Sequence, residues 1–136
     1  MRPVARGGEL YDPAMDPALL AVDGSGSLAG LLTYRIDDRG FEIGTLHAAT
    51  QREGIGSALL DAAIAVAREA GIGRIWLVTT NDNLDAVRFY QRRGFHLVEL
   101  HPGAVDRSRA TLKPSIPAIG EHGIPIRDEL VLERKS

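Results

Sequence analysis

The sequence predicts a mixed α/β or α+β fold in which helices pack on a sheet. Three observations predict it: apolar runs of strand length joined by short turns, stretches of helical period, and further strand-like runs between and after them. The chain has 136 residues, which fits one domain over residues 1–136. A chain of this length buries a core without disulfide or metal staples.

The first half of the chain predicts three strands. Leu19 to Val22 is a short apolar run, and Leu28 to Ile36 and Phe41 to Ala48 add β-branched and aromatic residues. The sequences between these runs, at 23–26 and 37–40, are rich in Asp and Gly and are typical of turns. We therefore expect antiparallel neighbours. Residues 1–17 hold three prolines and a Gly-Gly pair, and we expect them to be mostly irregular.

Helical period begins after these strands. From Gly54 to Ala70, apolar residues recur at helical spacing and predict an amphipathic helix: Ile55, Ala58, Leu59, Ala62, Ala63 and Val66. The remaining elements are predicted in this order: a strand from Arg74 to Thr80, a helix from Leu84 to Arg93 with Asn81, Asp82 or Asn83 as cap, a strand from Phe95 to Leu100, a short helix from Val105 to Leu112, a long loop from Lys113 to Pro125, and a strand from Arg127 to Glu133.

Composition excludes several kinds of site and partner. The chain has no cysteine, so disulfides, cysteine-based zinc sites and cysteine nucleophiles are excluded. No metal site is predicted, because the four histidines (His47, His96, His101 and His122) form no recognisable ligand pair. The net charge of -2 argues against a nucleic-acid partner. The apolar runs are too short to span a membrane and no signal peptide is evident, so we expect a cytoplasmic protein.

The junction between the third strand and the first helix is suited to an anion. The first N–H groups of a helix lack intrahelical partners and carry partial positive charge. Gly54 and Gly56 allow the backbone to approach a ligand closely, which suits a pyrophosphate. The junction is not a Walker loop, because no Gly-Lys-Ser/Thr follows. It is not a dinucleotide turn either, because Leu59 stands three residues beyond Gly56.

Two segments resemble one known family. Gln51-Arg52-Glu53-Gly54-Ile55-Gly56 is similar to the Gln/Arg-x-x-Gly-x-Gly/Ala motif of the GCN5-related N-acetyltransferases, the GNAT superfamily. The segment from Asn83 to Phe95 resembles the family's Asn-x-x-Ala-x-x-Phe-Tyr-x-x-x-Gly-Phe sequence. The likeness covers roughly Leu19 to Leu100. It implies a mixed, mostly antiparallel central sheet with flanking helices, here with the amino-terminal helices reduced or absent.

The resemblance also implies a coenzyme, acetyl-CoA, and a set of residues that bind it. The first motif would hold the pyrophosphate, and backbone groups of the strand before it would hold the pantetheine arm and the acyl carbonyl. The implied coenzyme-binding residues are Leu46, His47, Ala48, Gln51, Arg52, Glu53, Gly54, Ile55, Gly56, Ser57, Asn83, Ala86 and Tyr90.

The spacing of the second motif places Asn83, Ala86, Tyr90 and Arg93 on one helix face. An asparagine amide suits the amide-rich pantetheine arm, because it both donates and accepts hydrogen bonds. The competing interpretation is a helix that merely packs on the sheet, although Leu84, Val87 and Phe89 already offer packing surface.

Tyr90 is the candidate general acid. Aminolysis of a thioester expels a thiolate, and a tyrosine with a pKa of about 10 stays protonated at neutral pH and can donate to that sulfur. The competing interpretation is a structural tyrosine whose hydroxyl bonds to the backbone. The resemblance favours the catalytic role.

Glu42 is the candidate base that deprotonates the amine, directly or through water. The competing interpretation is an exposed strand residue, with His47 as the rival base and Tyr34 as a more distant one. Because Glu42 and His47 are five positions apart, a regular strand without a bulge places them on opposite faces.

The leading function is therefore an N-acyltransferase that moves an acetyl group to an amine acceptor, a small molecule or a peptide. The alternative is a non-catalytic acyl-CoA-binding regulatory module with the same fold. Because only about 18 residues precede Leu19, we expect the acceptor site to be open or to be completed by a second subunit, as in a homodimer. The long segment from His101 to Ile126 is a candidate cover for that site or a dimer contact, or a surface loop of no catalytic role.

Overall fold

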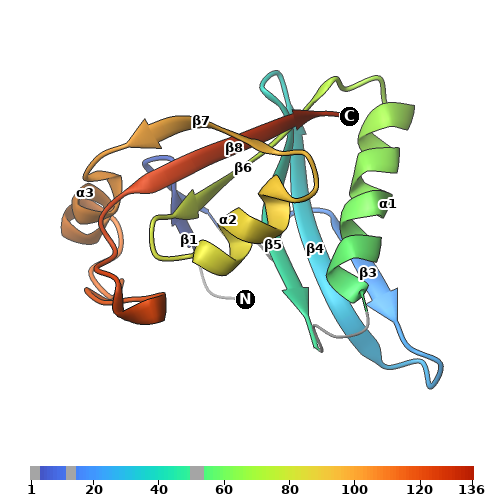
Figure 1. The fold of residues 1–136 in the computed structure, drawn as a ribbon, viewed down its shortest axis with the longest axis horizontal. Helices are drawn as coiled ribbons and strands as arrows, with labels where there is room; N and C mark the ends of the chain where they lie inside the picture. Colours follow the sequence, from blue (N-terminus) through green and yellow to red (C-terminus); the bar gives the residue numbers. More distant parts are fainter. Residues whose placement is uncertain (1–3, 12–14, 50–53) are drawn as a thin grey trace. The chain divides into compact units, whose positions relative to one another are not determined.

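The computed structural model describes residues 4–11, 15–49 and 54–136 of the chain. Within these ranges the fold is mixed α/β, with a six-stranded, mostly antiparallel sheet, a separate two-stranded sheet and three α-helices (Figure 1). The chain forms two compact units, one of residues 13–76 with 135–136 and the other of residues 1–12 with 77–134. None of the helices in the described ranges is long and apolar enough to cross a membrane.

The unit of residues 13–76 contains a three-stranded antiparallel arrangement in the order β3-β4-β5. The strands are β3 (Ala18–Val22), β4 (Leu28–Asp37) and β5 (Gly40–Ala48), which confirms the three predicted strands. The Asp23 carboxylate accepts hydrogen bonds from the N–H groups of Ser25 and Ser27 and fixes the first turn. In the second turn the Asp37 carboxylate accepts one from the Arg39 N–H.

Helix α1 (Ile55–Glu69) packs beside β3 and β4 in the same unit (Figure 1). The contact is close at Gly30, where an added Cβ would lie 2.7 Å from Ile55 Cγ2 and 2.9 Å from Leu59 Cδ1. The buried face of α1 differs from the predicted one: Leu59, Leu60, Ala63, Ile64 and Ala67 are buried. Ala58 and Ala62, predicted on that face, are exposed. The helix turns its larger side chains inward, because Leu60 and Ile64 bury more apolar area than two alanines.

A β-bulge interrupts β5. Thr33 of β4 pairs with Thr45, whereas Tyr34 pairs with Ile43, so that Gly44 is an additional residue on the β5 side. The Thr33 hydroxyl accepts a hydrogen bond of 2.8 Å from the Thr45 N–H. A bulge reverses the alternation of faces along a strand, which matters for the residues on either side of it.

The other unit contains the carboxyl-terminal elements. The chain enters it within β6 (Arg74–Thr80), and α2 (Leu84–Gln91), β7 (His96–His101), α3 (Ala104–Thr111) and β8 (Glu129–Lys135) follow. Strands β7 and β8 are antiparallel, and β8 lies between β6 and β7. All of these elements were predicted, although β8 begins two residues later than expected. Its start is displaced because the N–H groups of Arg127 and Asp128 donate to the Asn81 side chain instead of to a strand.

The expectation of irregular structure at the amino terminus was wrong. β1 (Val4–Arg6) and β2 (Glu9–Tyr11) form a small antiparallel hairpin. Gly7 and Gly8 make its turn with φ angles of 60° and 78°, a combination that type I′ turns require and that glycine adopts without strain. The Gly-Gly pair was one reason to expect irregular structure, but two glycines between short strands are a hairpin signal.

Candidate active site

The start of α1 has the properties that an anion site requires. Gly54 is the residue before the helix and adopts a left-handed conformation, with φ 69° and ψ 18°. It contributes no capping side chain, and no acidic residue occupies the first turn of the helix. The partial positive charge of the helix N-terminus is therefore not neutralised by a first-turn carboxylate.

Space is available at this helix start. A Cβ added at Gly54 would meet no described atom within 4 Å. Ile55, Gly56 and Ser57 are half-buried in the first turn. Gln51, Arg52 and Glu53, the first half of the predicted pyrophosphate motif, lie outside the described residues, so their roles stay predictions.

The end of β5 leads toward this helix start. Leu46 and Ala48 are half-buried and pair with Leu32 and Gly30, so they share the sheet face on which α1 packs. His47 points to the opposite face and is exposed. Backbone groups of this stretch stay the predicted partners of the pantetheine arm.

The bulge in β5 changes the relation between Glu42 and His47. Glu42 pairs with Arg35 and His47 pairs with Leu31, two residues on the same face of the unbulged β4. Glu42 and His47 therefore share one face, because β5 contains the bulge that the expectation of opposite faces had excluded.

The surroundings of Glu42 also exclude one interpretation of it. Its side chain is 7% exposed, so it is not an exposed strand residue. Arg35, opposite Glu42, donates from Nε to Asp16 at 3.1 Å. Tyr34 lies on the α1 face, where it stacks on Phe41 with ring centroids 4.7 Å apart. The structure thus separates Tyr34 from the face that carries the two other candidate bases.

Asn83 caps helix α2. Its Oδ1 accepts a hydrogen bond of 3.2 Å from the Ala86 N–H, and its Nδ2 donates to the Thr79 hydroxyl at 3.1 Å. This confirms the capping prediction and accounts for part of the amide's hydrogen-bonding capacity. A coenzyme contact of Asn83, like that of half-buried Ala86, stays a prediction.

Tyr90 is the buried side chain of α2, with 5% exposure. Its ring packs edge-on against Phe89 and Phe95, at centroid distances of 5.1 and 5.2 Å. The packing role was expected of Leu84, but Leu84 is 46% exposed, so that expectation was wrong. The helix buries the face that carries Tyr90, because an aromatic ring buries more apolar surface than the side chain of Leu84 would.

The protonation of Tyr90 suits a proton donor. Burial raises the pKa of Tyr90 above its ordinary value, and the positive charge of Arg6 lowers it to a smaller degree. The hydroxyl therefore keeps its proton through the neutral range. The Tyr90 hydroxyl is not among the fully buried side-chain atoms that lack a hydrogen-bond partner, so the catalytic role of Tyr90 stays a prediction beside the structural one.

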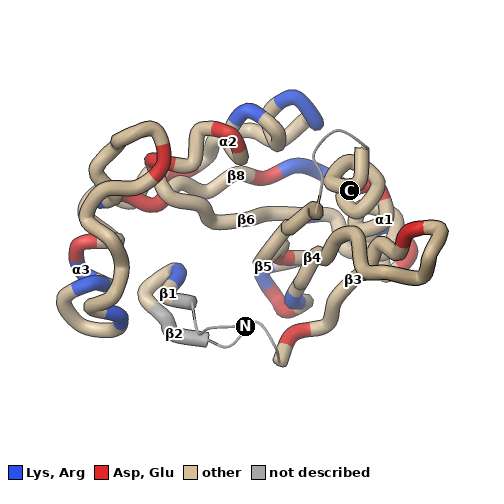
Figure 2. The backbone as a smooth tube through the Cα atoms, turned by 90° about the horizontal axis from the view of Figure 1, so that it is seen from below, with Lys and Arg blue, Asp and Glu red and all other residues tan. Residues whose placement is uncertain are grey.

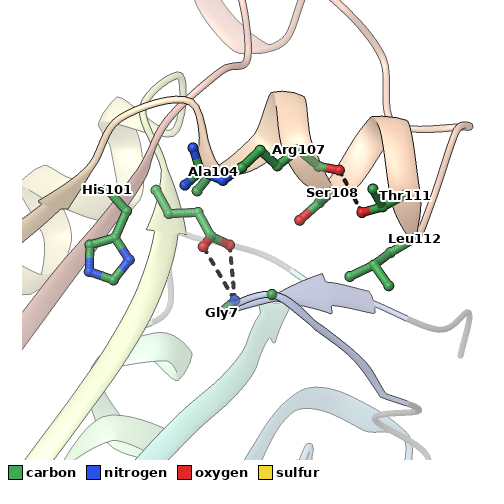
Figure 3. A pocket seen from close by; sticks show the side chains of 9 residues that line it. Gly7, His101, Ala104, Arg107, Ser108, Thr111 and Leu112 are labelled. Atoms are coloured by element: carbon green, nitrogen blue, oxygen red, sulfur yellow. Dashed lines mark hydrogen bonds between the residues drawn. The ribbon is translucent and has the colours of Figure 1, made fainter.

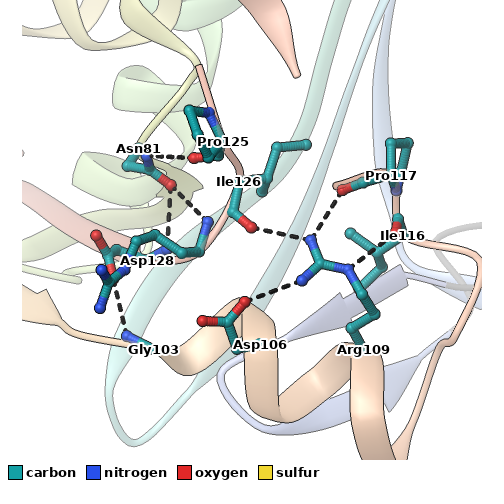
Figure 4. A network of polar contacts seen from close by, with 10 residues as sticks. Asn81, Gly103, Asp106, Arg109, Ile116, Pro117, Pro125, Ile126 and Asp128 are labelled. Atoms are coloured by element: carbon teal, nitrogen blue, oxygen red, sulfur yellow. Dashed lines mark hydrogen bonds and ion pairs between the residues drawn. The ribbon is translucent and has the colours of Figure 1, made fainter. Parts of the chain in front are cut away.

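Polar side chains hold the long connection between α3 and β8 (Figure 4). Arg109 donates to the carbonyl oxygens of Ile116, Pro117 and Ile126 at 2.8–3.0 Å and pairs with Asp106 at 2.9 Å. Asn81 donates to the Pro125 carbonyl at 2.9 Å. The predicted long loop is thus confirmed, and it is anchored to two other elements of its unit.

Two exposed side chains of this connection, Glu121 and His122, approach the exposed side chain of Asp85 in α2. The ligand atoms of Asp85, Glu121 and His122 lie within 4.8 Å, and His122 Nε2 is 3.4 Å from Asp85 Oδ1. No spacing in the sequence indicates this group, because more than thirty residues separate Asp85 from Glu121. All three residues are exposed, which suits a solvated ion pair.

A pocket of about 240 Å³ lies between the β1–β2 turn and α3 (Figure 3). Its lining residues are Gly7, Gly8, His101, Ala104, Arg107, Ser108, Thr111, Leu112 and Glu129. Sequence reasoning did not find it, because the hairpin at one end of the chain and Glu129 near the other meet only in the fold.

Comparison with known proteins identifies the fold. A family model described as the acetyltransferase (GNAT) family matches residues 5–95. The chain belongs to the GNAT acetyltransferase family. The GNAT assignment confirms the resemblance seen in the two motifs and the mixed, mostly antiparallel sheet.

Individual GNAT relatives agree with this. YdhI of Bacillus subtilis is 44% identical over 114 residues, which cover 84% of this chain and 71% of YdhI. A streptothricin acetyltransferase of Streptomyces lavendulae is 32% identical over 106 residues, covering 72% of this chain and 56% of that protein. A GNAT acetyltransferase structure from Elizabethkingia anophelis with acetyl-CoA bound has a TM-score of 0.75 and 23% identity, covering 90% of this chain and 78% of that one.

Proposed function

We propose that this GNAT chain transfers an acetyl group from acetyl-CoA to an amine by direct attack in a ternary complex. The observation that carries the proposal is Tyr90, a buried tyrosine at the motif position that the family comparison covers. Burial raises the pKa of Tyr90, which favours the proton-bearing form that a proton donor needs.

The coenzyme has support from two sides. The start of α1 offers an uncapped, positively polarised helix terminus, which is suited to a pyrophosphate. The Elizabethkingia anophelis neighbour of the same fold holds acetyl-CoA. We propose that Gly54 to Ser57 hold the pyrophosphate of acetyl-CoA, together with Gln51, Arg52 and Glu53.

The reaction then needs three proton transfers. The ammonium form of the acceptor loses a proton to Glu42, directly or through water, and the free amine attacks the thioester carbonyl carbon. A C–N bond forms, and the nitrogen then loses its second proton to Glu42, which has passed the first one to solvent. The C–S bond breaks, the coenzyme leaves as a thiolate, and Tyr90 donates its proton to that sulfur and regains one from solvent.

Replacing Tyr90 by Phe tests the acid. We expect kcat, followed by release of free thiol from acetyl-CoA with a panel of amines, to fall about 100-fold or more. The dissociation constant of coenzyme A should stay near the wild-type value, because the ring and its packing remain. Tyr34→Phe removes a hydroxyl from the α1 face and is the matched control, with unchanged kcat.

Two results would count against the proposal. Equal kcat in Tyr90→Phe and Tyr34→Phe would exclude Tyr90 as the proton donor. Tight coenzyme binding by the wild-type chain, without thiol release on any amine, would favour the alternative of a non-catalytic acyl-CoA-binding module.

Replacing Glu42 by Gln tests the base. We expect kcat/KM at pH 7 to fall, and the loss to shrink as the pH approaches the amine's own pKa of about 10.4, because free amine then forms without a base. The measurement is a pH profile of kcat/KM for wild type, Glu42→Gln and His47→Gln. A loss confined to His47→Gln would transfer the role to His47.

A further inference from the structure

The pocket between the β1–β2 turn and α3 contains a buried carboxylate. Glu129, the first residue of β8, is 3% exposed. Its two carboxylate oxygens accept the Gly7 N–H at 3.2 and 3.3 Å (Figure 3). A carboxylate offers about four acceptor positions, so one shared N–H leaves most of them unused.

The cationic side chains beside Glu129 are directed elsewhere. Arg107 donates from Nη1 to the Pro102 carbonyl at 3.1 Å. His101 pairs with Glu129 across the ladder, but its Nε2 lies 3.5 Å from Glu99 Oε1. Within the described ranges, no ion pair of Glu129 with a basic side chain is found. A buried carboxylate with one N–H partner has acceptor positions left over, and a cationic ligand would fill them.

The rest of the lining indicates what kind of cation fits. Ala104 and Leu112 provide an apolar wall, and Ser108 and Thr111 provide hydroxyls. A cavity of about 240 Å³ corresponds to roughly eight water volumes. That space suits one short aliphatic arm with a charged end, rather than a whole large acceptor.

The pocket is connected to Tyr90 within the same unit. Gly7, which bonds to Glu129, follows Arg6 directly, and the charge of Arg6 acts on the Tyr90 hydroxyl. The end of β6, which leads into α2, is also tied to β8, through the Asn81 N–H and the Asp128 carbonyl at 3.1 Å. The pocket and Tyr90 therefore belong to the same compact unit.

We propose that this pocket binds a non-reacting ammonium group of the acceptor, with Glu129 as its counter-ion, so that the acceptor is a diamine or a larger polyamine. This rests on the proposed function. The ammonium at Glu129 cannot be the attacking group, because a carboxylate partner favours the charged form and opposes the deprotonation that attack requires. A second amine on the same molecule is then the nucleophile.

The test compares 1,4-diaminobutane with butylamine in wild type and Glu129→Gln. Glutamine keeps an oxygen for the Gly7 N–H and removes only the charge. We expect wild type to prefer the diamine in kcat/KM by about tenfold or more, and Glu129→Gln to lose that preference through a fall in kcat/KM for the diamine. The exposed Glu121→Gln is the matched control and should keep the preference.

A binding experiment separates this inference from the proposed function. With coenzyme A, which carries no acyl group, calorimetry should show binding of butylammonium but not of uncharged 1-butanol, and Glu129→Gln should abolish it. Thr111→Trp, which narrows the pocket without a change of charge, should weaken it too.

The outcomes are then distinct. If both proteins acetylate amines and Glu129→Gln prefers the diamine as strongly as wild type does, the inference is overturned and the proposed function stays intact. If no amine is acetylated, the proposed function fails. Binding that requires the charge of butylammonium and is lost in Glu129→Gln would still support an ammonium site at Glu129. The inference would be overturned if the wild-type protein bound butylammonium and 1-butanol equally well, or if it bound neither.

Discussion

Tyr90 meets two requirements at one position, because it fills the space beneath α2 and keeps a proton on its hydroxyl. The first follows from its contacts with Phe89 and Phe95. The second follows from burial, which raises its pKa. The sequence motif predicted the proton donor but not the burial, since helical spacing alone did not say which side of a short helix would turn inward.

The raised pKa of Tyr90 has a consequence for stability at high pH. The folded protein keeps this proton where the unfolded chain has lost it, so the free energy of unfolding should fall as pH rises past the unfolded pKa of about 10. We expect urea unfolding between pH 9 and 11 to show this decline in wild type and a smaller one in Tyr90→Phe. Parallel declines in both proteins would mean that Tyr90 does not titrate differently on folding.

At the scale of elements, the helices and strands of the six-stranded sheet were predictable from periodicity and turn sequences. Three features were not. The bulge at Gly44 depends on a cross-strand register that a single strand does not reveal. The start of β8 depends on the Asn81 side chain, which comes from another part of the chain. The β1–β2 hairpin was missed because a Gly-Gly pair next to prolines resembles a flexible segment.

The contact between α1 and β4 depends on the absence of a side chain at Gly30. A methyl group there would overlap Ile55 and Leu59, so Gly30→Ala should lower the free energy of unfolding by about 1–3 kcal/mol. Gly24→Ala is the control, because a Cβ at Gly24 meets no described atom within 4 Å. Chemical denaturation of both variants measures the difference. A Gly30→Ala protein as stable as Gly24→Ala would show that α1 shifts freely on the strand.

At the scale of the whole molecule, the sequence motifs identified the family and the coenzyme, and the GNAT match and the acetyl-CoA-bound neighbour agree with both. The acceptor side was not predictable. The contacts that hold the connection between α3 and β8, such as those of Arg109 with the carbonyl oxygens of Ile116 and Ile126, also have no signature in local sequence. Figure 2 shows acidic and basic residues together on α3, where Asp106, Arg107 and Arg109 lie.

Arg109 should control how firmly the connection of residues 113–126 is held. Its guanidinium bonds three carbonyl oxygens there, so Arg109→Ala should loosen the segment by about 2 kcal/mol or more in local opening free energy. Limited proteolysis with thermolysin should then cut within this segment faster than in wild type. The exposed Arg92→Ala serves as control. Equal cutting rates in all three proteins would place the anchoring elsewhere, for example in Asn81.

The hydrogen bond from Gly7 to Glu129 joins residues that are 122 positions apart. During translation at 5–20 residues per second, the hairpin therefore waits roughly 6–25 seconds for its partner to be made. In that interval the nascent chain can complete β3, β4, β5 and α1, whose contacts are local, whereas the amino-terminal hairpin stays without its buried carboxylate. The unit that contains residues 1–12 is thus begun first and completed last, because Glu129 is synthesised after β3, β4, β5 and α1.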